Sequence, residues 1–160
     1  MQKRGQLQLS FGMIFSILII IVTVGVAFYV ISEFMETGRC TELRAFHENL
    51  QREIDTTWRS ASAQLTYNRA LPSSVTSVCF GSIATLDKER HGVEAAAFQS
   101  YRDTDNNFFI HPVQCGRGVS VRQLSHVGVA KAFCVPVRDG KVKLALSKAA
   151  STSSEVTLSP

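Results

Sequence analysis

A long run without charge opens the chain. Between Arg4 and Glu33 there is no Asp, Glu, Lys or Arg, and residues 11–31 are almost wholly apolar. An α-helix rises about 1.5 Å per residue, so residues 9–31 would extend roughly 34 Å, more than the roughly 30 Å of a bilayer's hydrocarbon core. A cleaved secretory signal has a shorter apolar region that ends in small residues, and no Ala-x-Ala-like site follows this run. The pattern therefore predicts a retained transmembrane helix over residues 9–32.

Past this span the apolar positions change to a spacing of three and four residues. They are Leu43, Phe46, Leu50, Ile54, Trp58, Ala61 and Leu65. This spacing predicts one apolar face of an amphipathic helix over residues 33–71, continuous with the span. Pro72 should end the helix, because a residue that precedes proline disfavours helical backbone angles.

After Pro72 the pattern becomes one of short β-branched and aromatic runs separated by turn residues. Strands are predicted at residues 75–80, 107–111, 119–124, 133–138, 141–146 and 155–158, and a short helix at residues 93–98. Asp139 and Gly140 predict a two-residue hairpin turn, and Pro136 predicts that its strand lies at a sheet edge. The predicted fold class is α+β: a long N-terminal helix, then a small antiparallel β-rich head over residues 72–148 and a C-terminal tail over residues 149–160.

Charges at the two ends of the span predict the orientation. Lys3 and Arg4 precede the span, whereas Glu33 and Glu36 follow it. Under the positive-inside rule, residues 1–8 form a cytoplasmic basic leader, and the head of this single-pass cell-membrane protein is extracytoplasmic. The formal net charge of +4 is scattered along the chain, without the basic stripe of a nucleic-acid-binding protein. We therefore expect the lipid bilayer, and no nucleic acid, as a partner.

All four cysteines follow the span, where an extracytoplasmic location would allow them to oxidise. They are Cys40, Cys79, Cys115 and Cys134, and four cysteines allow three pairings. A helix that continued to residue 70 would carry the head far from Cys40. We therefore expect a disulfide between two of the three distal cysteines, with Cys40 free or cross-linked to a neighbouring copy.

A zinc site is the alternative use of these cysteines, completed by His111 or His126. No Cys-x-x-Cys spacing supports it, and Pro112 disfavours a helical pair of His111 with Cys115. We therefore expect no metal and no cofactor.

Two further patterns suggest chemistry but lack the residues that it needs. Residues 103–107 begin like a calcium loop, but Phe108 replaces the required glycine and Gln114 replaces the bidentate glutamate. No Gly-x-Ser-x-Gly element predicts a hydrolase. No catalytic residue is therefore expected, and the chain is not expected to be an enzyme.

The order of segments resembles a type IV pilin: a basic pair, a small polar patch, an apolar span, an amphipathic helix and a β-rich head. Residues 3–11, Lys-Arg-Gly-Gln-Leu-Gln-Leu-Ser-Phe, are similar to the archaeal class III leader, which a peptidase cuts after a basic-Gly pair so that the mature chain begins with Gln. The resemblance implies a leader-processing region at Gly5 and Gln6. The chain also resembles archaeal membrane-anchored proteins that share this leader, a strand like residues 71–80 and a hairpin like residues 139–143.

One position departs from the pilin pattern, in which a glutamate follows the key glutamine by four residues. Here that position is Gly12 when counted from Gln8, or Ser10 when counted from Gln6, and no acid precedes Glu33. A carboxylate in lipid is costly, so its absence is typical of an ordinary anchor.

The architecture leaves two classes of function. The first is a pilin-like structural or cell-surface interaction protein, for which the resemblance implies filaments. The second is an accessory or receptor-like subunit of a membrane complex, with a ligand-binding head. A small head should leave Leu43 and Phe46 exposed, so another helix should cover them. We therefore expect a homo-oligomer, or a membrane-protein partner, that packs against Leu43, Phe46, Leu50 and Ile54.

Overall fold

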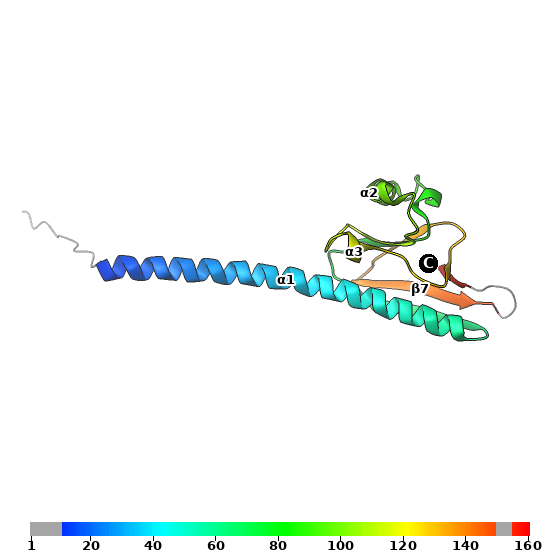
Figure 1. Ribbon diagram of the computed structural model, residues 1–160, viewed down its shortest axis with the longest axis horizontal. Helices are drawn as coiled ribbons and strands as arrows, with labels where there is room; N and C mark the ends of the chain where they lie inside the picture. Colours follow the sequence, from blue (N-terminus) through cyan, green and yellow to red (C-terminus); the bar gives the residue numbers. More distant parts are fainter. Residues whose placement is uncertain (1–10, 150–154) are drawn as a thin grey trace, which may run out of the picture. The chain divides into compact units, whose positions relative to one another are not determined.

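The computed structural model describes residues 11–149 and 155–160. The chain divides into two compact units, Met1–Thr37 and Gly38–Pro160, which are described separately. Helix α1, Phe11–Arg59, contributes its N-terminal part to the first unit and its C-terminal part to the second (Figure 1). The predicted processing residues Gly5 and Gln6 lie outside the described residues.

Helix α1 ends at Arg59, so the prediction that it continues to residue 71 is wrong. Residues Ala63–Ala70 instead form strand β1, which pairs along its whole length with strand β7, Lys141–Lys148, in antiparallel register. A three-to-four-residue spacing over so few residues does not separate a helix from a strand. Pairing with a segment far along the chain decides between them.

The second unit contains two four-stranded sheets, with strand orders β1-β7-β8-β5 and β4-β3-β2-β6. The remaining strands are β2 Ser77–Phe80, β3 Phe108–His111, β4 Val121–Arg122, β5 Val127–Gly128, β6 Phe133–Pro136 and β8 Val156–Ser159. Helices α2 Gly92–Ala97 and α3 Arg117–Ser120, with 3-10 helices η1 Ile83–Thr85 and η2 Gln99–Tyr101, lie between strands. All strand pairs are antiparallel except β5 with β8. The predicted α+β class, a long helix followed by a small β-rich region, is confirmed.

The C-terminal part of α1 shares one core with both sheets. Leu43, Phe46, Leu50 and Ile54 are buried in it together with residues of β2, β3, β7 and β8, and Figure 1 shows β7 running alongside this part of the helix. Successive side chains of a strand point to opposite faces. In β2, Val78 and Phe80 therefore face this core, whereas Cys79 faces a second core that contains Phe98.

The local predictions near β6 and β7 were right about the turn and wrong about the hairpin. Asp139 and Gly140 adopt positive φ angles of 51° and 66°, and Arg138 pairs with Lys141 across them. However, β6 and β7 belong to different sheets, so this turn carries the chain from one sheet to the other. Pro136 does lie in an edge strand, since β6 ends its sheet.

Other predicted elements differ in their limits. Strand β3, helix α2 and strand β8 lie where a strand, a short helix and a strand were predicted. The strand predicted at residues 119–124 is wrong in its first part, because α3 includes Val119 and Ser120 and only Val121–Arg122 forms β4.

Candidate functional site

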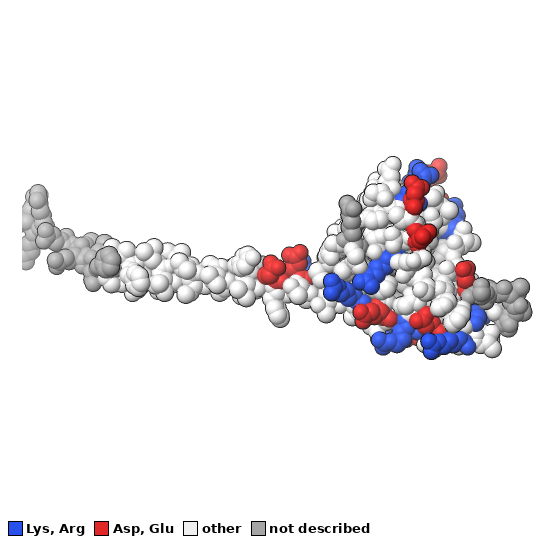
Figure 2. All heavy atoms as spheres, in the orientation of Figure 1, with Lys and Arg blue, Asp and Glu red and all other residues white. Residues whose placement is uncertain are grey.

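The apolar part of α1 is exposed along its length in this single chain. Every residue in 12–39 is exposed, with exposed fractions of 71% at Phe28 and 78% at Phe34. Residues 12–32 of this stretch contain no Lys, Arg, Asp or Glu, and Figure 2 shows a white length of helix before the first acidic side chains. The helix has a window of mean hydropathy 2.9, so by length and composition it could cross a membrane or act as a signal anchor.

Hydroxyl groups within the apolar part are bonded inside the helix. Ser16 Oγ donates to Gly12 O at 2.8 Å, Thr23 Oγ1 to Ile20 O at 2.9 Å, and Ser32 Oγ to Tyr29 O at 2.8 Å. Unsatisfied polar groups are costly in hydrocarbon. These three side chains are therefore compatible with lipid.

Two disulfides cross-link the second unit. Cys40 of α1 is bonded to Cys115 in the loop between β3 and α3, and Cys79 of β2 to Cys134 of β6. The expected bond within the distal part of the chain is present, but the prediction that Cys40 stays free or links to another copy is wrong. That prediction assumed that α1 continues to residue 70. The chain instead turns back after Arg59, so that Cys115 of the head lies beside Cys40.

The predicted oligomer interface is also buried within the chain. Leu43, Leu50 and Ile54 have exposed fractions of 0%, and Phe46 of 4%. The expectation that Leu43 and Phe46 stay exposed is therefore wrong. These four residues, which we call the α1 stripe, pack against the head because β1 returns along the helix and brings both sheets to it.

A buried histidine lies beside this stripe. The His47 ring contacts Phe108 edge-on, at 5.5 Å between centroids, and neither ring nitrogen has a hydrogen-bond partner among the described residues. Burial lowers the pKa of His47, the charge of Arg122 lowers it further, and Glu48 opposes both. His47 is therefore held in its neutral form inside the core.

Tyr67 of β1 contacts Phe46. Its hydroxyl donates to Phe46 O at 3.4 Å, and the two rings lie edge to face at 5.8 Å. Burial raises the pKa of Tyr67 to about 12; Arg69 acts against this and Glu53 adds to it. The phenol is therefore neutral at physiological pH and contributes to packing.

Near its end, α1 is bonded to the loop between β4 and β5 through side chains that we call the clasp. His126 Nδ1 lies 3.2 Å from Asp55 Oδ1, and Ser125 N donates to Gln51 Oε1 at 3.0 Å. Trp58 stacks on the His126 ring, with centroids 3.9 Å apart. No sequence pattern predicts this contact, because Asp55 and His126 are 71 residues apart in the chain.

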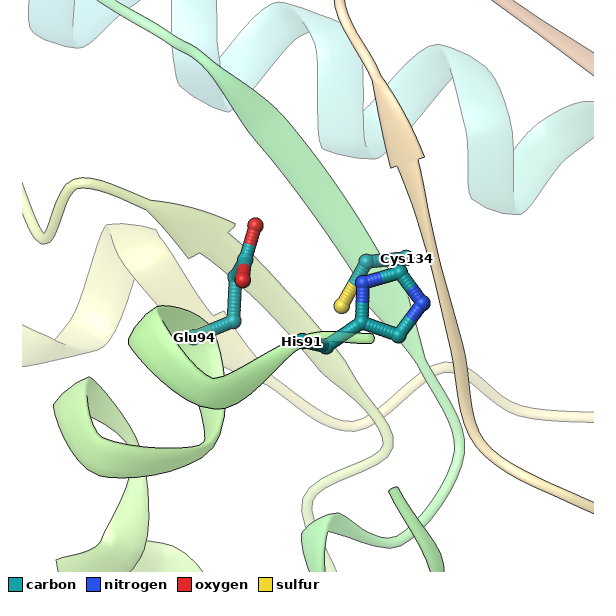
Figure 3. A group of neighbouring side chains, drawn as sticks. All are labelled: His91, Glu94 and Cys134. Carbon is teal, nitrogen blue, oxygen red and sulfur yellow. The ribbon is translucent and has the colours of Figure 1, made fainter. Parts of the chain in front are cut away.

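A group that resembles metal ligands lies under α2. His91, Glu94 and Cys134 bring a nitrogen, a carboxylate oxygen and a sulfur within 4.8 Å of one another (Figure 3). The Cys134 sulfur is bonded to Cys79, and Glu94 Oε1 accepts a hydrogen bond from Ser77 Oγ at 2.9 Å. A metal-binding cysteine acts as a thiolate, so these residues do not form a ready ligand set in the oxidised chain.

The cysteines of the alternative zinc site and one residue of the calcium-like segment have other partners. No cysteine is free, so none offers a thiolate to His111 or His126. In the calcium-like segment, Asn107 Nδ2 donates to Leu124 O, and Leu124 N donates to Asn107 Oδ1. Asn107 therefore connects two loops rather than leaving its oxygen to a cation.

Comparison of the chain with protein-family models, with curated proteins and with solved structures found no match. The resemblance to type IV pilins therefore stays a prediction.

Proposed function

We propose that this chain is a single-pass, membrane-anchored, pilin-like structural or cell-surface interaction protein. The observation that carries the proposal is the exposed, uncharged stretch of α1 over residues 12–32. Its length suits a bilayer, and an apolar surface of this size needs a lipid or protein cover.

Charge and oxidation state support an extracytoplasmic second unit. Lys3 and Arg4 precede the apolar stretch, and Glu33 and Glu36 follow it, which is the distribution expected for a cytoplasmic N-terminus. The two disulfides suit an oxidising compartment, in which such bonds form and persist.

The burial of the α1 stripe changes the proposed route to assembly. Leu43, Phe46, Leu50 and Ile54 are covered by their own head, so contacts between copies would use the exposed residues of 12–35 instead. Shape-complementary packing of such a segment with other helices, as in a filament or bundle, would bury it without a carboxylate.

The alternative is an accessory or receptor-like subunit of a membrane complex. It is supported by a hollow of about 180 Å³ beside α2, whose apolar wall includes Ile83, Ala95 and Ala96 and whose cations are Lys88 and Arg102. Apolar walls with a few polar groups are typical of small-ligand sites.

Labelling of intact cells tests the topology. We expect a membrane-impermeant maleimide to react with a cysteine placed at exposed Ser100 of η2, while the same reagent leaves Thr23→Cys unlabelled because lipid covers it. The native cysteines are silent as long as both disulfides are intact. Labelling of Ser100→Cys only after lysis would overturn the orientation, and equal labelling of Thr23→Cys would overturn the membrane span.

Electron microscopy of surface preparations tests assembly. Filaments that contain the chain would support the structural subunit, and a discrete co-purifying complex would support the accessory subunit. A monomer in mild detergent with neither assembly would contradict both forms of the proposal.

A further inference from the structure

A hollow of about 600 Å³ lies where the chain passes from the second sheet to the first. Asn68 of β1, Val135 and Pro136 of β6, and Lys141 and Lys143 of β7 line it. The turn residues Arg138 and Asp139 complete the lining. The hollow therefore joins β1 and β6, which are edge strands of the two sheets.

Positive charge dominates this hollow. Lys141 and Lys143 lie two residues apart on β7, so they share a face at a separation of roughly 7 Å. Arg138 pairs with Lys141 across the turn. All three side chains are exposed, and none of them has a salt bridge among the described residues. Asp139 is the acid that the described residues contribute to the lining, so three of their cations lie beside one carboxylate.

The same face continues onto β1 without further charge. Asn68 lies directly opposite Lys143 and Ala70 opposite Lys141, and opposite residues of an antiparallel pair share a face. An amide therefore adjoins the row of cations, while Val135 and Pro136 form an apolar wall. The cations suit acidic groups of a ligand, the amide suits its hydroxyl groups, and the apolar wall suits its C–H surfaces.

We infer that this hollow binds a segment of an acidic polysaccharide. Arg138, Lys141 and Lys143 hold its carboxylate or sulfate groups, and Asn68 bonds its hydroxyl groups. A volume of about 600 Å³ exceeds that of a single small anion. Among the described residues, no aromatic side chain lines the hollow, whereas sites for single-stranded nucleic acids stack bases on aromatic rings. The charge and lining therefore favour a sugar polymer over a nucleic acid.

Binding should be measured on the purified, oxidised full chain in neutral detergent. The probes are polygalacturonate for carboxylates, dextran sulfate for sulfates, neutral dextran, and single-stranded DNA, each at about 50 and 300 mM salt because screening weakens exposed charge contacts. We expect one or both acidic polysaccharides to bind at low salt and neutral dextran not to bind. The stronger of the two identifies the acidic group.

The variant that tests the site is Arg138→Gln/Lys141→Gln/Lys143→Gln. Its matched control is Arg44→Gln/Arg52→Gln/Arg59→Gln, which removes the same charge from exposed positions of α1. We expect the first to weaken binding by at least about tenfold and the control by less than about twofold, since local potential rather than net charge attracts the ligand.

A milder change keeps the test valid if the triple variant fails to fold. Asp139→Asn removes the acid that the described residues contribute to the lining, and asparagine tolerates the positive φ of 51° at this position. We expect this variant to bind acidic polysaccharide a few-fold more tightly, and Asp105→Asn, in an exposed turn, to leave binding unchanged. Equal losses in the two triple variants, no binding of either acidic polymer, or tighter binding of DNA would overturn the inference.

Discussion

The disulfide between Cys40 and Cys115 should be a main source of stability for the second unit. It joins residues 75 positions apart, with Cα atoms 5.4 Å apart. The chain-entropy relation for a closed loop of that length gives roughly 4.5 kcal/mol of stabilisation, and measured disulfide losses usually fall between about 2 and 5 kcal/mol. We therefore expect Cys40→Ser/Cys115→Ser to lower the free energy of unfolding by about 2 to 4.5 kcal/mol.

The single tryptophan provides the assay. Trp58 stacks on His126 in the clasp, so its fluorescence should change when α1 separates from the head. Urea unfolding of the full chain in detergent would give the free energy for the native protein and the variant. Cys79→Ser/Cys134→Ser is the matched comparison, because its separation of 55 residues gives a similar value, roughly 4.2 kcal/mol, by the same relation.

The two variants should differ in where the structure opens. Cys40 precedes the buried Leu43, so loss of its bond should increase amide hydrogen exchange in α1 around residues 40–46. Loss of the bond between Cys79 and Cys134 should instead increase amide hydrogen exchange in β2 and β6. A change below about 1 kcal/mol for the Cys40 variant, where typical losses are larger, or peptide mapping that finds Cys40 unpaired in the native protein, would refute this reasoning.

Two further predictions concern the core between α1 and the sheets. His47 has a pKa lowered by burial and by Arg122 from its ordinary value of 6.5, so the unfolded chain binds more protons in acid. The stabilisation that neutral His47 contributes should be complete above about pH 6.5 and should be lost progressively as the pH falls below that value. The urea midpoint of unfolding should therefore decrease between about pH 7.5 and pH 5. The variant His47→Leu should show a weaker dependence of this midpoint on pH. Leu50→Ala should cost about 2 to 5 kcal/mol, because it leaves a cavity where the side chain is fully buried, whereas Leu65→Ala, at 39% exposure, should cost much less in the same urea titration. Equal costs for the two leucines would contradict the observed burial.

Local patterns were sufficient where one segment's own residues decide its structure. The uncharged run before Glu33 predicts the apolar part of α1, because the length and composition of a helix are properties of consecutive residues. The positive φ angles of Asp139 and Gly140 likewise follow from residues that tolerate them. The edge position of Pro136 follows from its missing N–H donor.

Tertiary structure decided everything that depends on two distant segments. Residues 63–70 form a strand because β7 pairs with them. Their own sequence does not distinguish a strand from a continuation of α1 by about two turns. The same return of the chain brings Cys115 to Cys40 and covers Leu43. The apolar spacing correctly places Leu43, Phe46, Leu50 and Ile54 on one face of α1, but the prediction assigned the cover of that face to another molecule. Spacing along a chain shows which side chains need a cover, whereas only the folded backbone shows which segment provides it.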